Sequence, residues 1–233
     1  NILAVTFTNK AAKEMRERAS RLMGEDAKSL HMGTFHAMCA RWLRIEGKAI
    51  DISPDFVIYD DGDQVGLMKR ILDDLHLDSR RFTPRTILSS ISSAKSEMIT
   101  PALFESQARN YFDEVVARAY HRYEKSLRAA SALDFDDLLL EAVRLFEAPD
   151  VLAKYQEKWR YLHVDEYQDT NRAQYLWGRA LAAKYPNPAG VGDDHTSVYS
   201  AAGPDPRHPL RCAQGGAGYL GSTCPRVIVH VDR

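Results

Sequence analysis

The sequence is poor in cysteine and has no long apolar run. Three of its 233 residues are cysteine, and their odd number and unpaired spacing argue against a disulfide framework or a zinc site. No apolar stretch approaches the roughly 20 residues that a membrane-spanning helix requires, and no signal peptide is recognisable. We therefore expect free thiols at Cys39, Cys212 and Cys224 in a cytosolic protein.

The sequence also lacks a net charge of either sign. It has 31 lysine and arginine residues against 32 aspartate and glutamate residues. No global basic field therefore attracts nucleic acid, and any such affinity must come from a local surface. With 45% hydrophobic and 27% charged residues, the chain is long and apolar enough to bury a core in one or two domains.

A glycine-rich loop that could cradle phosphate groups is absent as well. Such a loop ends in Gly-Lys-Ser/Thr, where backbone amides and the lysine neutralise the phosphates. Gly47-Lys48 is followed by Ala49 and has no glycine upstream at the required spacing, whereas residues 216–222 contain glycines but no lysine. The most recognisable part of a nucleotide site is therefore missing from this chain.

What the sequence does contain is an acidic motif, VDEYQDTN, at residues 164–171. The residues before it are apolar and aromatic enough for a buried strand, and those after it have helical character. Asp165 and Glu166 are therefore expected at the carboxyl end of a strand, where ligands bind in open parallel sheets. Because Mg²⁺ prefers oxygen ligands and keeps several waters, we assign Asp165 to this ion, through water, and Glu166 to an attacking water. The simpler interpretation, a solvated turn before a helix, is weakened by the polar run from Gln168 to Asn171.

The remaining pattern predicts two α/β parts on either side of a helical block. Residues 2–7 are typical of a buried strand, followed by a helix that Thr8 or Asn9 caps and Gly24 ends. A second helix is expected over residues 35–46. From residue 51 to about residue 132 the apolar spacing is wholly helical.

The end of the first predicted strand carries side chains suited to single-stranded nucleic acid. Phe7 can present an aromatic face to a base, a contact worth roughly 1–3 kcal/mol. Thr8 and Asn9 can hydrogen-bond phosphate or sugar. Taken alone, however, Phe7 is more often a core residue and Asn9 a plain helix cap.

Five motifs, in order, resemble those of the superfamily 1 DNA helicases of the UvrD, Rep and PcrA type. Residues 1–15 (NILAVTFTNKAAKEM) and 33–39 (GTFHAMC) are similar to two motifs of that family that contact single-stranded DNA. Residues 133–139 (LDFDDLL) are similar to a short motif that precedes the acidic strand. Residues 164–171 resemble the second Walker motif, and residues 192–199 (GDDHTSVY) the motif that couples ATP to DNA.

The resemblance implies an α/β fold, a RecA-like P-loop NTPase core with a parallel sheet, incomplete at its amino end and carrying an inserted all-helical subdomain. The corresponding divisions are residues 1–46 and 133–205 for the core, 47–132 for the insertion and 206–233 for a degenerate carboxyl-terminal segment. In the family the phosphate loop lies just before the position of Asn1. The sequence is thus expected to be a truncated amino-terminal half of a helicase.

The resemblance also gives roles to individual residues. It implies that ATP and Mg²⁺ are bound by Asp165 and Asp194, and that catalysis involves Asp165, Glu166 and Gln168. It implies contacts with DNA from Phe7, Thr8, Asn9, Thr34, His36 and Tyr199. For His36 the usual alternative for a lone histidine applies, namely a surface position or a satisfied place in the core.

The implied function is that of a fragment of an ATP-dependent DNA helicase, with 3′-to-5′ translocation on single-stranded DNA and unwinding of duplex during repair or replication. Expected partners are single-stranded DNA, duplex junctions and accessory proteins, without a membrane, in the cytoplasm or on a bacterial nucleoid. The alternatives are a non-hydrolysing module that binds single-stranded DNA or protein, the helicase portion of a recombination nuclease, and an inert fragment.

The carboxyl-terminal part departs from the family pattern. Thr196 stands where the family has a γ-phosphate-sensing glutamine, and Gly221 stands where it has a phosphate-stabilising arginine. Ala201 and Ala202 replace a DNA-stacking tryptophan and its arginine. We interpret these linked losses as sequence error or gene decay. Because the phosphate loop is missing too, we expect negligible ATPase activity from this polypeptide alone.

Overall fold

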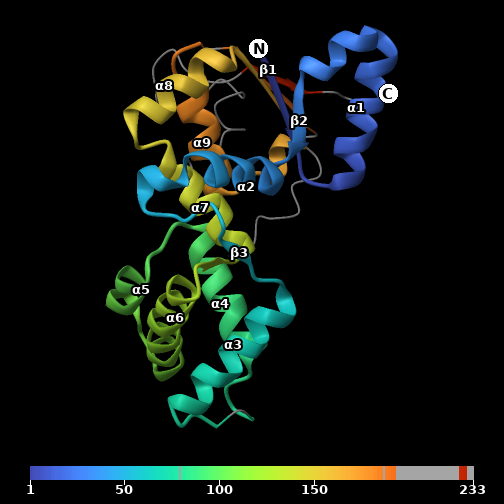
Figure 1. Cartoon of the computed structure of the whole chain (residues 1–233). Coiled ribbons are helices and arrows are strands. Elements are labelled where there is room, and N and C mark those ends of the chain that lie inside the picture. Colours follow the sequence, from blue (N-terminus) through green and yellow to red (C-terminus); the bar gives the residue numbers. More distant parts are fainter. Residues whose placement is uncertain (79, 186, 193–225, 230–233) are drawn as a thin grey trace, which may run out of the picture. The chain divides into compact units, whose positions relative to one another are not determined.

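The chain forms two compact units (Figure 1). The computed structural model describes residues 1–78, 80–185, 187–192 and 226–229. Unit 1 comprises Asn1–Met38 and Phe146–Arg233, and unit 2 comprises Cys39–Leu145. Unit 2 thus lies between the two parts of unit 1 in the sequence. Among the helices of the described ranges, none is both long and apolar enough to span a bilayer.

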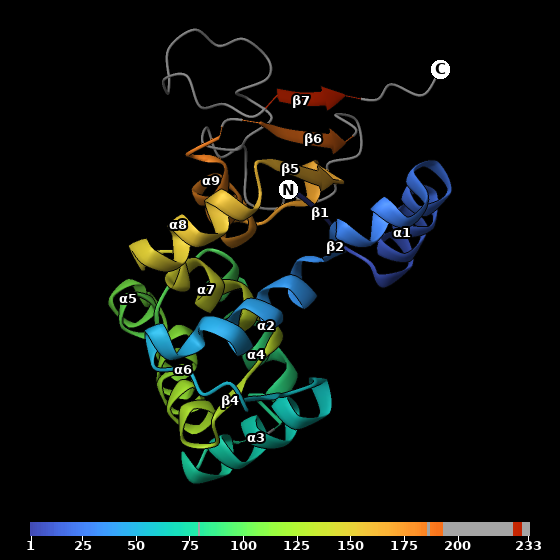
Figure 2. The same ribbon diagram turned by 45° about the horizontal axis from the view of Figure 1, so that its top comes forward.

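Unit 1 is built on a five-stranded sheet (Figure 2). In spatial order its strands are β2 (His31–Thr34), β1 (Ile2–Thr6), β5 (Tyr161–Asp165), β6 (Pro188–Gly192) and β7 (Arg226–Val229). Every neighbouring pair is parallel. The parallel α/β sheet predicted from the sequence is therefore confirmed, and β1 and β5 are the two strands expected from the apolar runs.

The helices of unit 1 connect the strands of this sheet. They are α1 (Asn9–Met23), α8 (Pro149–Lys158) and α9 (Arg172–Ala182), with 3₁₀ turns η1 (Gly24–Ser29) and η3 (Tyr167–Asp169). Alternation along each strand separates two faces. Leu3, Val5, Leu162 and Val164 are buried on one face. On the other face of β5, His163 is exposed, so the sheet is closed on one side and partly open on the other.

Helix α1 begins and ends at the predicted residues. The Thr8 hydroxyl accepts a hydrogen bond from the Ala11 backbone N–H at 3.1 Å and so caps the helix. The helix ends before Gly24, whose φ of 60° lies in the region that favours glycine. Local sequence therefore fixes both ends of the helix that follows β1.

Helix α2 (Phe35–Glu46) has the predicted bounds, beginning in unit 1 and ending in unit 2. It carries Cys39, a free and fully buried thiol whose pKa is raised by burial. Because the thiolate is the reactive form, this raised pKa makes Cys39 a poorly reactive thiol. The other two cysteines, Cys212 and Cys224, lie outside the described residues.

Unit 2 is mainly helical but not wholly so. After η2 (Gly47–Ile50) come β3 (Val57–Ile58), α3 (Asp61–Asp74), α4 (Pro84–Ser96), α5 (Pro101–Gln107), α6 (Tyr111–Ala129), β4 (Ala132–Leu133) and α7 (Phe135–Leu145). Strands β3 and β4 pair in parallel, Val57 with Ala132 and Ile58 with Leu133. The prediction of an all-helical segment from residue 51 to about 132 is therefore wrong. Two-residue strands are too short to leave a period in the sequence, and only the fold brings their partners together.

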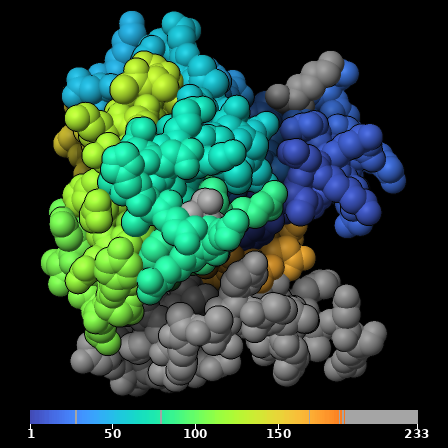
Figure 3. Space-filling view, turned by 90° about the horizontal axis from the view of Figure 1, so that it is seen from below, coloured from blue at the N-terminus to red at the C-terminus, as the bar shows by residue number. Residues whose placement is uncertain are grey.

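The helix starts in unit 2 follow ordinary capping chemistry. The side chains of Asp60, Thr83, Thr100 and Asn110 each accept a backbone N–H from the first turn of α3, α4, α5 and α6, respectively. Pro84 stands at the first position of α4, where its missing N–H costs nothing. Figure 3 shows α3, in teal, and α6, in yellow-green, at the surface of this unit.

The core of unit 2 is an apolar cluster from α3, α4 and α6 that includes Met68, Leu72, Ile87, Ile91, Val115, Val116, Tyr120, Tyr123 and Leu127. Next to it lies a buried ion cluster centred on Lys95 of α4, which is 1% exposed. The Lys95 Nζ atom lies 2.8 Å from Asp134 Oδ2, 2.5 Å from Asp137 Oδ1 and 2.8 Å from Glu124 Oε1. Burial alone would lower the pKa of Lys95, but the three carboxylates raise it well above its ordinary value. The lysine is therefore charged.

The two aspartates of this cluster also form the start of α7. The Asp137 backbone N–H donates to Asp134 Oδ1 at 2.8 Å, and the Asp134 N–H donates to Asp137 Oδ2 at 3.1 Å. Tyr123 of α6 donates its hydroxyl to Asp134 Oδ2 at 3.0 Å. Lys95 thus ties α4 and α6 to the first turn of α7. The LDFDDLL motif, residues 133–139, supplies both carboxylates.

Replacement of Lys95 by methionine tests how much this cluster contributes to the stability of the fold. Lys95→Met keeps most of the side-chain volume but leaves three carboxylates without a cation. Breaking a buried pair in this way typically costs about 3–5 kcal/mol, and we expect a loss of that size in the free energy of unfolding in urea. The exposed Lys69 of α3 gives the matched control Lys69→Met, expected to change stability by less than about 0.5 kcal/mol. Equal stabilities of the two variants would contradict a structural role for the cluster.

Candidate functional site

The carboxyl ends of three strands lie side by side in unit 1. Strand β1 pairs with β2 so that Thr6 is opposite Thr34. It pairs with β5 so that Val5 is opposite Val164, which brings the next residue of each strand, Thr6 and Asp165, together. The residues that follow each strand therefore leave the sheet on the side where the strands end, which we call its carboxyl edge. In parallel α/β sheets this is the edge where ligands bind.

The acidic motif meets β1 through a direct hydrogen bond. Thr6, which is 1% exposed, donates its hydroxyl to Asp165 Oδ2 at 3.1 Å. Asp165 itself is half-buried. Within the described part of the chain, its second oxygen, Oδ1, has no hydrogen-bond partner. Sequence reasoning missed Thr6, because only the strand register shows that it is the neighbour of Asp165.

Glu166 is exposed and has a left-handed backbone conformation, with φ 52° and ψ 47°. This conformation costs a residue with a Cβ atom roughly 1–2 kcal/mol, a cost that glycine does not have. The turn after it is closed by the Asp169 N–H, which donates to the Glu166 carbonyl oxygen at 3.0 Å.

The polar residues after the acidic pair have mostly structural contacts. The Thr170 hydroxyl donates to the Tyr167 carbonyl at 2.8 Å. Asn171 caps α9 by accepting the Gln174 N–H at 2.9 Å, and Gln174 accepts the Asn171 N–H in return at 2.9 Å. The side chain of Gln168, expected to be catalytic, lies outside the described part of the structure. These contacts build the turn that presents Asp165 and Glu166.

The donor set at this edge fits a magnesium ion held mainly by water and phosphate. Among the described residues, no group of three or more His, Cys, Asp or Glu side chains could hold a metal. Asp165 offers one carboxylate with an oxygen still available. Mg²⁺ in nucleotide sites commonly uses one or two carboxylates and keeps several waters, so a single carboxylate suits that ion better than a cation that needs a complete protein cage. Asp194, the second predicted nucleotide ligand, lies outside the described residues.

The predicted DNA-contacting residues after β1 lie at the same edge. Phe7 is half-buried, and its ring lies 5.0 Å from the ring of Phe35, which in turn lies 5.3 Å from that of Trp177. Both of those inner rings are buried. Thr8 and Asn9 are exposed at the start of α1. Phe7 is therefore packed against a buried ring and still keeps part of its surface exposed.

The residues predicted after β2 form the start of α2. The Thr34 side chain is buried, and its hydroxyl accepts the Ala37 backbone N–H at 3.2 Å. His36 is half-buried, and burial lowers the pKa of its imidazole. The ring is therefore neutral at neutral pH and suits a hydrogen bond better than a charge contact. The last predicted DNA contact, Tyr199, lies outside the described residues, as do Thr196, Ala201, Ala202 and Gly221.

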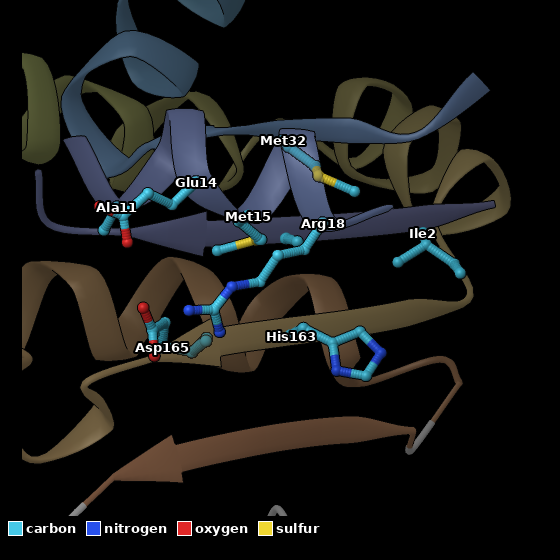
Figure 4. Close-up of a pocket in the computed structure, with 10 residues that line it drawn as sticks. Ile2, Ala11, Glu14, Met15, Arg18, Met32, His163 and Asp165 are labelled. Atoms are coloured by element: carbon cyan, nitrogen blue, oxygen red, sulfur yellow. The ribbon is translucent and has the colours of Figure 1, made fainter. Parts of the chain in front are cut away.

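A cleft of about 420 Å³ opens between α1 and the face of β1 and β5 that carries Ala4 and His163. Figure 4 shows Arg18 extending from α1 across this cleft toward Asp165, with His163 beside it. Sequence reasoning gave no role to Arg18 or His163. Strand alternation would have placed His163 on the same face as the predicted site residue Asp165, two residues later, whereas no signal in the sequence pointed to Arg18.

Comparisons with known proteins agree on one family. Residues 1–213 match the model of the UvrD/REP helicase N-terminal domain. The chain is 47% identical to the ATP-dependent DNA helicase PcrA of Bacillus subtilis (strain 168) and 46% identical to that of Staphylococcus aureus (strain Mu50), over 206 residues, which is 88% of this chain and 28% of each relative. It is 49% identical to the PcrA helicase of Leuconostoc citreum over 204 residues, 87% of this chain and 27% of that relative. The chain thus spans little more than a quarter of these relatives.

The backbone conformation of Glu166 gives a testable difference between two substitutions. Glu166→Ala and Glu166→Gly both remove the carboxylate, but only glycine adopts φ 52° without steric cost. Glycine's greater freedom in the unfolded chain offsets part of this gain. We expect the glycine variant to be more stable than the alanine variant by about 1 kcal/mol, measured by urea unfolding. An alanine variant of equal or greater stability would rule out the strained turn.

Proposed function

The chain belongs to the UvrD/REP helicase family, and on that basis we propose that the carboxyl edge of the unit 1 sheet joins a nucleotide site to a contact with single-stranded DNA. The observation that carries this proposal is the strand register, which sets Thr34, the loop from Phe7 to Asn9, and the pair Asp165-Glu166 along one edge. Three motifs far apart in sequence thereby become one site.

At the nucleotide end, we assign Asp165 to the hydrated magnesium ion of Mg-ATP and Glu166 to the attacking water. Magnesium bound to the phosphates would neutralise the charge that develops during phosphoryl transfer. Asp165 is suited to hold it because Thr6 fixes one carboxylate oxygen at 3.1 Å. Glu166, exposed at the start of the turn, can orient the water and accept its proton. Gln168 and Asp194 complete the proposed set, as the resemblance implies.

At the nucleic-acid end, Phe7 stacks on a base, while Thr8, Asn9 and Thr34 contact the backbone. The row of packed rings behind Phe7 supports it against displacement. Backbone N–H groups in the first turn of α1 add donors for phosphate. His36 contributes a neutral hydrogen bond, in keeping with its lowered pKa. Tyr199 is proposed as a second stacking residue from the motif at residues 192–199.

The wider activity follows from the relatives. We propose that the parent function is ATP-dependent translocation on single-stranded DNA, 3′ to 5′, with unwinding at duplex junctions. The fold assignment is a RecA-like core formed by residues 1–46 and 133–205, interrupted by an insertion at 47–132 and followed by a degenerate segment at 206–233. The two compact units, which divide after Met38 and after Leu145, support an interrupted core.

A second candidate function is a non-hydrolysing module that binds single-stranded DNA. It is favoured by Thr196 and Gly221, which stand in place of the family's glutamine and arginine. For this polypeptide by itself we therefore propose binding of DNA without sustained ATP turnover.

Substitution of Phe7 tests the DNA contact that both candidates share. Phe7→Leu keeps an apolar side chain against Phe35 but removes the aromatic face. Loss of base stacking should weaken binding of an oligo-dT strand by roughly 1–3 kcal/mol, or about 5- to 150-fold, as measured by fluorescence anisotropy. Tyr111→Leu, at an aromatic residue of unit 2 that is 52% exposed, should leave the affinity unchanged.

The same titration separates the two candidates. Release of the strand on addition of Mg-ATP favours the motor, whereas an affinity that nucleotide leaves unchanged favours the binding module. Equal affinities of wild type and Phe7→Leu would contradict the assignment of Phe7 as a stacking residue.

A further inference from the structure

Thr6 is the last residue of β1, and its side chain is directed to the same face of the sheet as Asp165. Its hydroxyl is buried and reaches Asp165 Oδ2 at 3.1 Å. The pairing of Val5 with Val164 sets this geometry. As a β-branched residue, threonine has few accessible χ1 rotamers, so the hydroxyl position follows the backbone closely. Any shift of the end of β1 therefore moves the donor relative to the carboxylate.

The backbone that carries Thr6 continues directly into the loop with Phe7, Thr8 and Asn9. The ring of Phe7 rests on Phe35 at 5.0 Å, and Thr8 is fixed as the cap of α1 at 3.1 Å. The loop is thus held on both sides of Phe7, which is half-buried. A base that stacks on Phe7 would act on the residue next to Thr6, with one peptide bond between them.

The Thr6–Asp165 bond satisfies the buried hydroxyl of Thr6, and its effect on Asp165 is separate from that role. Asp165 is half-buried, so water can satisfy its carboxylate, and a hydrogen bond in such a place adds only about 1 kcal/mol to stability. The bond does, however, select one orientation of the carboxylate. It occupies Oδ2 and leaves Oδ1, which has no partner within the described ranges, for a second ligand.

This inference rests on the proposed function. We propose that Thr6 is a positioning residue: when single-stranded DNA binds at Phe7–Asn9, Thr6 sets the orientation of the Asp165 carboxylate. The link has two parts, the peptide bond from Thr6 to Phe7 and the hydrogen bond from Thr6 Oγ1 to Asp165 Oδ2. Bound single-stranded DNA fixes the loop, and the loop in turn fixes the position of the Thr6 hydroxyl. The bound DNA thus determines which Asp165 oxygen accepts the hydrogen bond, although the DNA itself does not contact Asp165.

Carbon-13 NMR of the aspartate carboxyl carbons tests the link without any ATP turnover. The Asp165 signal is identified by its disappearance in Asp165→Asn, and the protein is titrated with an oligo-dT strand. We expect the Asp165 signal to shift on saturation in wild type and in Thr6→Ser, which keeps a hydroxyl. Thr6→Val has the shape of threonine but no hydroxyl. In this variant the shift should be lost, while the affinity for the oligo-dT strand should change by less than about threefold. Thr6→Ala, which also lacks the hydroxyl, serves as a second variant should valine perturb folding.

The outcomes separate this inference from the function on which it rests. An Asp165 shift of equal size in wild type, Thr6→Val and Thr6→Ala would overturn the coupling role, and so would a wild-type signal that stays fixed while the strand binds. In both cases strand binding, and with it the proposed function, would stand. A wild-type protein that binds no strand would instead remove the proposed function and this inference together. A shift lost in both variants and kept in Thr6→Ser supports the link, because a merely structural bond would not make the signal respond to the strand.

Discussion

The site depends on one constraint, the parallel register of β1 with its two neighbours. Thr6 lies opposite Thr34, and Val5 lies opposite Val164. The three strands therefore end at the same level. Because side chains alternate across a sheet, a slip of one residue would turn Asp165 to the other face and separate it from Thr6. The buried Leu3, Val5, Leu162 and Val164 hold this register, since each would be exposed by such a slip. Apolar burial on one face of the sheet thus determines the chemistry at its edge.

The two units use carboxylates in opposite ways. In unit 1, Asp165 is half-buried and Glu166 is exposed at the carboxyl end of β5. In unit 2, Asp134 and Asp137 are buried, capped on each other and bonded to Lys95. Burial raises the pKa of Asp137 well above its ordinary value, against the opposing charge of Lys95. The LDFDDLL motif is therefore explained by the integrity of a helical unit, whereas in VDEYQDTN the residues after the acidic pair build a turn that leaves Glu166 exposed.

Local chemistry allowed much of the fold to be predicted from the sequence. The cap at Thr8, the end at Gly24, the start at Pro84 and the strands before Phe7 and Glu166 follow from residue types and apolar period alone. Long-range geometry could not be predicted in that way. The β3–β4 pair joins residues some 75 positions apart in the chain, and Lys95 finds Asp134 and Asp137 across 39 and 42 positions. Thr6 likewise became a site residue only when the strand order was known. For the candidate site, sequence identified the acidic pair and the loop after β1, but not the hydrogen bond that joins them.

Hydrogen–deuterium exchange of the chain with and without an oligo-dT strand tests most directly whether one sheet edge forms the site. Strand binding should slow amide exchange in peptides that cover residues 6–12 and 33–38, together with the turn at 165–169, because these segments leave the sheet side by side. Peptides from α3, residues 61–74, serve as the internal reference and should exchange at the same rate in both states. Protection confined to unit 2, with residues 6–12 and 165–169 unchanged in the bound state, would contradict the account.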